Sequence, residues 1–81
     1  MSVFIIIANY NSIKWIKTCL DHCSRYNVIV VDNNSTDGSL EYIIQRDNDR
    51  IHLIKEERNK GFGQANNIGI QKALSEGAEY V

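Results

Sequence analysis

Short, continuously apolar segments alternate along the chain with segments whose apolar residues recur at helical spacing. Residues 2–8 and 28–31 are apolar at nearly every position and rich in β-branched side chains, which is typical of strands covered on both faces. Residues 51–54 form a third, weaker segment of this type. The helical segments run from Asn11 or Ser12 to about Tyr26, around 40–44, and from about Gln64 to Glu76, with Gly77 as the stop.

The alternation of these segments predicts an α/β fold. Right-handed crossovers place the strands in one parallel sheet and cover both of its faces with helices, so we expect a three-layer, Rossmann-like architecture. Residues 78–81 look extended and predict the beginning of a fourth strand. A chain of 81 residues can bury one small core, and we therefore treat residues 1–81 as a single domain.

The composition is that of an ordinary globular domain, with 43% apolar and 23% charged residues. Nine Lys and Arg residues against ten Asp and Glu residues give a net charge of -1, and like charges form no run. Charge therefore indicates neither a nucleic acid nor a membrane partner. The longest apolar run, residues 3–8, is too short to span a bilayer or to form a signal-peptide core, so we expect a cytoplasmic protein.

The two cysteines, Cys19 and Cys23, lie four residues apart in the first predicted helix. A helix does not give such a pair the geometry of a disulfide, and both fall on the apolar stripe, so we expect reduced thiols in the core. Together with His22 they could instead supply three metal ligands. Because His22 points well to one side of the stripe, we favour core thiols and a surface histidine, and we predict no metal site.

Uncharged polar residues are concentrated in three segments that directly follow the predicted strands, namely 9–11, 32–35 and 59–63. The carboxyl ends of parallel strands meet at one edge of a sheet, where ligands bind. Amides and carboxylates can read the edge of a base, Tyr10 offers a stacking face, and Lys60 beside a helix N-terminus adds the positive potential that a diphosphate needs. Each of these residues could also simply cap a helix or close a turn.

One amide is predicted on the buried face of the last helix. At 100° per residue, the face that packs on the sheet consists of Phe62, Asn66, Gly69, Ile70 and Ala73. A buried amide without partners costs about 1–3 kcal/mol. We therefore expect Asn66 to tie the helix to a strand-end loop, to organise the ligand loop, or to do both.

Three blocks of the sequence together resemble the first part of a family 2 glycosyltransferase. They occur in order and at the right spacing, and they read VFIIIANYN (3–11), VVDNNSTDGS (30–39) and NKGFGQANNIGI (59–70). The closest resemblance is to the rhamnosyl- or galactofuranosyl-transferase-like branch, and it covers residues 3–81. It implies the nucleotide-binding half of a GT-A fold, truncated, with strand order 3-2-1 and a stub of strand 4 beside strand 1.

The resemblance also implies an activity and a set of residues. The activity is transfer of a sugar from a UDP- or dTDP-type nucleotide diphosphate to a saccharide or lipid-linked acceptor, in cell-wall or polysaccharide biosynthesis. Residues 8–11 would line the base and ribose pocket, Asp32 and Asn33 would contact the base, and 60–63 would lie near the ribose and diphosphate. The full implied nucleotide-sugar-binding set is Ala8, Asn9, Tyr10, Asn11, Asp32, Asn33, Ser35, Lys60, Gly61 and Asn66.

The sequence departs from the family in what it lacks. Family members carry an Asp-x-Asp-like motif after a fourth strand, which holds Mg²⁺ or Mn²⁺, and a catalytic base later still. This sequence ends at residues 78–81, where that strand would begin. We therefore predict no catalytic residue and no cofactor in this chain, expect the metal only in a full-length member, and expect no useful transfer by the chain alone. The missing C-terminal half is an expected partner, and a full-length protein could sit at the cytoplasmic membrane face.

Loss of most of the fourth strand would leave residues 3–7 as an exposed apolar edge. Bare sheet edges recruit other strands, so we expect a homo-oligomer, most simply a homodimer, formed through the exposed sheet. The alternative function is accordingly a noncatalytic, self-associating binding module built on the same fold. A receiver domain is disfavoured because residues 54–55, Ile and Lys, offer no acidic pocket at the end of the third strand.

Overall fold

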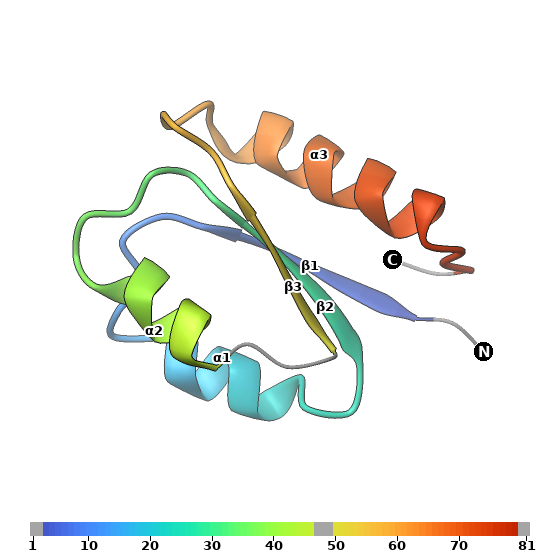
Figure 1. The fold of residues 1–81 in the computed structure, drawn as a ribbon, viewed down its shortest axis with the longest axis horizontal. Coiled ribbons are helices and arrows are strands. Elements are labelled where there is room, and N and C mark those ends of the chain that lie inside the picture. The colour runs from blue at the N-terminus through green and yellow to red at the C-terminus, as the bar shows by residue number, and fades with distance from the viewer. Residues whose placement is uncertain (1–2, 47–49, 80–81) are drawn as a thin grey trace.

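The chain folds into a three-stranded parallel sheet with helices on both faces (Figure 1). The computed structural model describes residues 3–46 and 50–79. The elements, in chain order, are β1 (Phe4–Asn9), α1 (Ile16–His22), β2 (Asn27–Asp32), α2 (Ser39–Gln45), β3 (Ile51–Lys55) and α3 (Phe62–Ser75). Figure 1 shows α3 along one face of the sheet and α1 and α2 together on the other.

The sheet confirms the predicted architecture and strand order. β2 lies in the centre, paired in parallel with β1 from Phe4↔Asn27 to Asn9↔Asp32 and with β3 from Val28↔Ile51 to Asp32↔Lys55. Residues 28–31 are each at most 2% exposed, as expected for an apolar strand covered on both sides. The predicted stub of a fourth strand is not observed at residues 78–79, and residues 80–81 lie outside the described part of the chain.

Alternate residues of β2 belong to two separate cores. On the α1 and α2 side the buried cluster contains Ile16, Leu20, Val28, Val30, Ile43 and Ile51. On the α3 side it contains Phe4, Ile29, Val31, Ala65 and Ala73. Because helices bury a core on each face, the polar loops at the strand ends are the part of the fold left for chemistry.

The first helix is shorter than predicted, because α1 spans only Ile16–His22. At its start, the carbonyl of Ser12 accepts hydrogen bonds from the amides of both Trp15 and Ile16, and at its end the amide of Cys23 donates to the carbonyl of Leu20. The i→i−3 bonds made by Trp15 and Cys23 tighten the chain at the two ends of α1, so the regular helix is shorter than predicted. Helical periodicity persists through such turns, which explains why the pattern predicted a longer element.

Cys19 and Cys23 are free thiols and half-buried, and Cys23 packs against the core beneath α1. Burial and the neighbouring Cys19 raise the pKa of the Cys23 thiol. His22 is exposed. Within residues 3–46 and 50–79 no group of three or more metal-ligating side chains lies close enough to hold an ion.

The predicted face of the last helix is wrong in part. α3 buries Ala65, Gly69 and Ala73 against the sheet, whereas Asn66 is exposed and Phe62 is 70% exposed. The helix lies so close to the sheet that a Cβ on Gly69 would stand 2.4 Å from Cγ2 of Ile6. Because α3 lies so close to the sheet, only its smallest side chains fit in the contact, and its larger side chains lie beside the contact. Asn66 therefore needs no buried partner.

None of the helices in the described residues combines the length and the apolarity needed to cross a bilayer.

Candidate functional site

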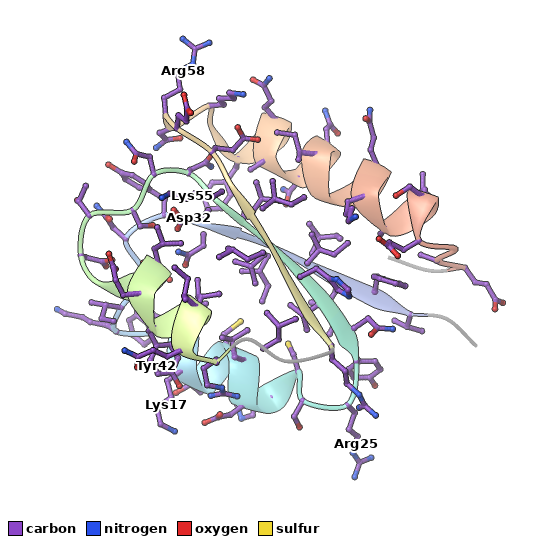
Figure 2. All side chains as sticks on the ribbon, in the orientation of Figure 1. Lys17, Arg25, Asp32, Tyr42, Lys55 and Arg58 are labelled. Carbon is purple, nitrogen blue, oxygen red and sulfur yellow. The ribbon has the colours of Figure 1, made fainter. Side chains whose placement is uncertain are left out.

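Three loops meet at the carboxyl edge of the sheet, as the sequence predicted. The β1 and β2 loops are joined by the amide of Asn33, which donates to the carbonyl of Asn9 (2.8 Å). The β2 and β3 loops are joined by the amide of Glu56, which donates to the carbonyl of Asp32 (2.8 Å). Figure 2 shows Asp32 inside this group of loops and Arg58 pointing outward from the β3–α3 loop. Segments far apart in the sequence thus form one polar rim.

Beneath the rim lies a network of buried polar side chains. The side-chain nitrogen Nδ2 of Asn9 donates to Oδ1 of Asp32 (2.8 Å) and lies 3.2 Å from the hydroxyl oxygens of Ser35 and Ser39. The Asp32 carboxylate also accepts from the amide of Ser35 (3.0 Å) and from its hydroxyl (2.7 Å). All four residues are at most 8% exposed, and among the described residues no buried side-chain polar atom lacks a partner. The Asp32 carboxylate and the Asn9 side-chain amide therefore already have hydrogen-bond partners within the network.

A second set of bonds fixes the starts of the two helices above this network. The Asn11 side chain accepts from the amide of Thr36 (2.7 Å), and the Asp37 carboxylate accepts from the amides of Ile13 and Ser39 (2.9 Å each). Partial burial raises the pKa of Asp37, but these hydrogen bonds to its charged form outweigh it, and the pKa lies below its usual value. Asn11 has φ 50, a left-handed conformation in which asparagine is favoured.

The loops that follow β1, β2 and β3 line a cavity of about 110 Å³. Its lining residues are Tyr10, Asn33, Asn59, Gly61 and Phe62. Asn33 is 3% exposed, and its side chain spans the two loops: Nδ2 donates to the carbonyl of Gly61 and Oδ1 accepts from the amide of Lys60, both at 3.5 Å. Bonds of that length are weak, so a ligand with better-placed donors and acceptors can compete for this amide.

Lys60 lies next to the cavity, with its charge partly balanced. Its ammonium group is 3.0 Å from Oε2 of Glu56, and its side chain is 28% exposed. The surrounding charged hollow, of about 490 Å³, is lined by Lys55, Glu56, Glu57, Arg58 and Lys60. The positive potential predicted for Lys60 therefore depends on whether an anion displaces the Glu56 carboxylate.

The structure divides the predicted site residues into three groups. Tyr10, Asn33 and Gly61 share the cavity, and Lys60 lies beside it. The supporting network consists of Asn9, Asn11, Asp32 and Ser35, none of which lines the cavity. Ala8, half-buried in β1, and Asn66, exposed on α3, lie outside it.

Two lining residues, Asn59 and Phe62, belong to the predicted ligand segment 59–63 but were absent from the predicted set of binding residues. Phe62 was assigned to the sheet-packing face of α3, and the structure places it on the cavity. Its position directly after Gly61 was the available signal. Gly61 has φ 86 and ψ 165, a positive-φ backbone conformation that glycine alone adopts readily. This conformation turns Phe62, the first residue of α3, toward the rim.

The carboxylates of Asp32 and Asp37 do not suit a divalent cation. Such a cation needs several carboxylate or carbonyl oxygens that are free to converge on it. Both oxygens of Asp32 and both oxygens of Asp37 already accept hydrogen bonds from the chain. The metal that the resemblance implies for longer relatives does not fit these residues.

Comparison with known proteins gives three similar relatives, all glycosyltransferases. The chain is 34% identical to dTDP-rhamnosyl transferase RfbF of Shigella flexneri over 99% of its length, and 30% identical to glycosyltransferase GlyG of Streptococcus pneumoniae over 91%. It is 34% identical to glycosyltransferase AglE of Haloferax volcanii over 88%. It spans only 27%, 27% and 26% of these three proteins, respectively. No solved structure gives a significant match.

The match to a family model is nearly complete. Residues 4–81 fit the model of glycosyl transferase family 2, a span that includes all three strands, all three helices and the polar rim. The blocks around Tyr10, Asn33 and Gly61 thus lie both in the matched sequence and around one cavity. The chain belongs to glycosyl transferase family 2, of which it represents an N-terminal portion.

Proposed function

We propose that this chain is the nucleotide-diphosphate-sugar-binding part of a glycosyltransferase. The observation that carries the proposal is that Tyr10, Asn33 and Gly61, from three separate loops, line one cavity at the carboxyl edge of the parallel sheet. The similar protein of Shigella flexneri is a dTDP-rhamnosyl transferase, which supports a dTDP or UDP type of donor. The half-buried free thiols of Cys19 and Cys23 suit the cytoplasm, where we propose that it acts in polysaccharide or cell-wall synthesis.

The residues of the rim would divide the work of binding. Tyr10 is 47% exposed and can stack on a base, and the Asn33 amide can both donate to and accept from the edge of that base. Lys60 would exchange its Glu56 partner for the diphosphate. The buried network around Asp32 would hold the loops in place without touching the ligand.

We also propose that the chain alone transfers no sugar. Departure of a nucleotide diphosphate needs its charge to be stabilised, which in this family is the work of a metal. The carboxylates of Asp32 and Asp37 are both committed to hydrogen bonds within the rim. The stabilising groups would come from a C-terminal portion like that of the longer relatives, which we propose as a partner of this one.

Titration calorimetry with UDP and dTDP, each with and without Mn²⁺, tests the binding proposal. We expect dissociation constants in the millimolar range or tighter, and weakening by Tyr10→Ala. The matched control is Tyr26→Ala, which removes a tyrosine of similar exposure (43% against 47%) that does not line the cavity. Flat titrations for both nucleotides, or equal losses in the two variants, would contradict the proposal.

A second candidate function, self-association, is supported by the outer edge of β1, which pairs with no strand among residues 3–46 and 50–79. The segment 3–9 carries no charged residue, whereas the opposite edge strand β3 carries His52 and Lys55. Native sheets protect their edges with charge, and β1 lacks that protection. An apolar groove of about 510 Å³ runs beside it, lined by residues of β1 together with Asn66 and Ile70 of α3.

The sequence of β1 suits antiparallel pairing with a second copy of itself. The carbonyl of Asn9 points toward β2, where it accepts from Asn33, so the backbone groups of Phe4, Ile6 and Ala8 point to the free edge. A two-fold axis through Ile6 would pair Ile6 with Ile6 and the large Phe4 with the small Ala8. We propose a homodimer of this kind as the state in which a noncatalytic module would act.

Light scattering after size-exclusion chromatography at micromolar concentration tests the dimer. We expect twice the chain mass, reduced to a single chain by Ile70→Lys, which charges the flank of the groove. Leu74→Lys is the matched control, because Leu74 is 60% exposed on the same helix and does not line the groove. A monomer in the unaltered chain would contradict self-association and leave nucleotide binding unaffected.

A further inference from the structure

Phe62 is a large apolar side chain that does not pack in either hydrophobic core. It is the first residue of α3, it is 70% exposed, and it belongs to neither buried core. Single exposed apolar residues are common, and Trp15 and Leu74 are others in this chain. Phe62 differs because it lines a cavity that a second exposed ring, Tyr10, also lines.

The neighbours of Phe62 fix its place at that cavity. Gly61 precedes it with φ 86, its amide donates to Oδ1 of Asn59 (2.8 Å), and its carbonyl accepts from Nδ2 of Asn33 (3.5 Å). The beginning of α3 is thus tied to the β2 loop from one side and to its own loop from the other. A phenyl ring held at a polar rim by these contacts is available to a ligand.

The walls of the cavity have a definite chemical character. Two aromatic side chains offer flat apolar surfaces, and the amides of Asn33 and Asn59 offer donors and acceptors between them. A planar heteroaromatic ring with polar groups on its edge matches both features, since base–aromatic stacking is favourable and amides read a base edge. The small volume, about 110 Å³, favours a single ring over a fused pair.

We infer that Phe62 forms the second wall of a slot for a pyrimidine base, opposite Tyr10, so that the base of a uridine or thymidine diphosphate donor stacks between the two rings. This inference rests on the proposed function and adds to it a binding residue and a reason for the pyrimidine preference. Asn33 and Asn59 would hydrogen-bond the edge of the base, and Gly61 would position the phenyl ring. Purine nucleotides would bind less well because the slot is short.

The test compares binding of dTDP, UDP and GDP by the unaltered chain and by Phe62→Ala, Phe62→Tyr and Leu74→Ala. We expect Phe62→Ala to weaken dTDP and UDP by about 5- to 100-fold, the loss that one stacking face produces. Phe62→Tyr keeps the stacking face and should bind like the unaltered chain. Leu74→Ala removes an apolar side chain of similar exposure from the same helix and should change nothing.

Two further readouts separate stacking from a structural role. Saturation-transfer NMR should show weaker transfer to the base proton H6 in Phe62→Ala, relative to the sugar protons. The unfolding midpoint should not change, because Phe62 packs in neither core.

Undiminished dTDP binding by Phe62→Ala, or tighter binding of GDP than of the pyrimidine nucleotides, would overturn this inference while the proposed function stands. Failure of the unaltered chain to bind any nucleotide would overturn both.

Discussion

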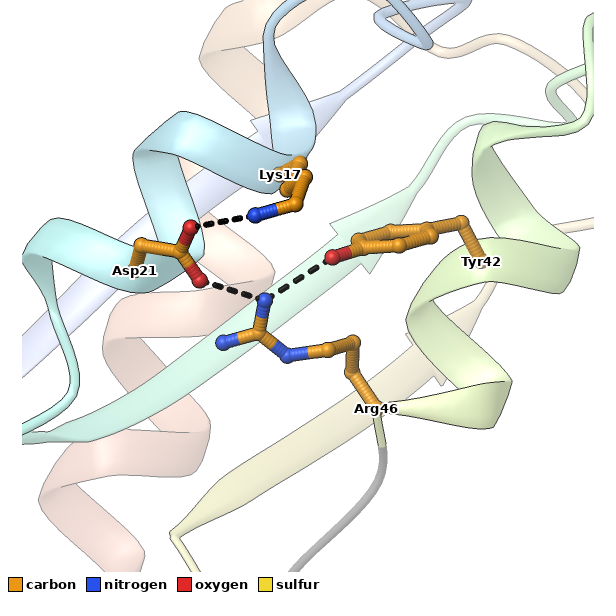
Figure 3. Close-up of polar contacts among 4 residues, drawn as sticks. All are labelled: Lys17, Asp21, Tyr42 and Arg46. Atoms are coloured by element: carbon orange, nitrogen blue, oxygen red, sulfur yellow. Dashed lines mark hydrogen bonds and ion pairs between the residues drawn. The ribbon is translucent and has the colours of Figure 1, made fainter.

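Two polar networks hold this molecule together, one buried and one exposed. The rim network joins Asn9 to Asp32 and the serines of the β2 loop, all at most 8% exposed. The surface network joins α1 to α2: Nη1 of Arg46 lies 2.6 Å from Asp21 and 2.8 Å from the Tyr42 hydroxyl, and Lys17 lies 2.9 Å from Asp21 (Figure 3). Both link segments more than 20 residues apart.

Burial makes these similar networks unequal. In the rim, losing one partner strands several donors away from water, and each unpaired group costs about 1–3 kcal/mol. On the surface, water replaces a lost partner and salt screens the charges. The hydrogen bonds from Lys17 and Arg46 lower the pKa of Asp21, and the bond to Asp21 raises that of Lys17, but both groups remain open to solvent. The comparison indicates that the loss of one partner costs much more stability in the rim network than in the surface network.

Removal of the central carboxylate should have the largest effect. Asp32→Ala removes the acceptor of both Ser35 donors and one of the three acceptors of Asn9 Nδ2, so we expect a loss of roughly 3 kcal/mol or more in the free energy of unfolding. The total for a chain of this length is about 4–12 kcal/mol. Urea unfolding measures the loss. Glu41→Ala, at an exposed site on α2, is the control, and equal values for the two variants would abolish the distinction between buried and exposed groups.

A change at the contact between α3 and the sheet tests whether apolar packing is as intolerant as the polar rim. In Gly69→Ala the new methyl group would meet Cγ2 of Ile6 at 2.4 Å and Cγ2 of Val31 at 3.4 Å. Overpacking costs about 1–3 kcal/mol and the better helix propensity of alanine returns about 1, so we expect a smaller net loss of about 1–2 kcal/mol.

Gly63→Ala is the matched control for that experiment, because no atom lies within 4 Å of its added Cβ and the helix should gain up to about 1 kcal/mol. Thermal unfolding of both variants checks the prediction. A stabilised Gly69→Ala variant would show that α3 can move away from the sheet at little cost.

The surface network should give the smallest effect and one that depends on pH. The pKa of Asp21 is lowered in the folded chain, so its stabilising contribution is fully present above the ordinary value of 3.8 and is lost as the pH falls through the lowered folded value. Asp21→Asn should therefore be slightly less stable than the unaltered chain at pH 7 and equal to it well below pH 3.8. Urea midpoints at both pH values, with and without 1 M salt, measure this. A difference that persists in acid or in salt would mean that the network behaves as a buried one.

Periodicity and β-branching were enough to predict the parallel sheet and its helices. They failed at the ends of α1, where turns at residues 12–15 and 23–26 carry i→i−3 bonds and keep a helical spacing beyond the regular helix. They also failed at Asn66, because a hydrophobic pattern does not register that Gly69 brings α3 unusually close to the sheet. Helix faces chosen by close approach are centred on the smallest residues.

For the site, the rule that ligand loops gather at strand ends predicted the rim and brought Tyr10 and Asn33 together. The rule does not say which polar residues face outward. Asp32 and Asn33 are neighbours in sequence, yet one is bound within the network and the other lies on the cavity. That distinction follows from alternation along an extended chain and from which donors surround each side chain, and both need coordinates.

The pairing of Asn9 with Asp32 also fixes how the strands align. β1 and β2 are apolar on both faces through residues 5–7 and 28–31, so a slip by one residue would still set apolar side chains against one another, and the hydrophobic pattern alone specifies their alignment weakly. A slipped pair would separate the Asn9 side-chain amide from the carboxylate and leave Asp32 with only its Ser35 donors. The polar pair therefore acts as a register lock at the end of the sheet, and it places Tyr10 and Asn33, the next residue of each strand, on the same cavity.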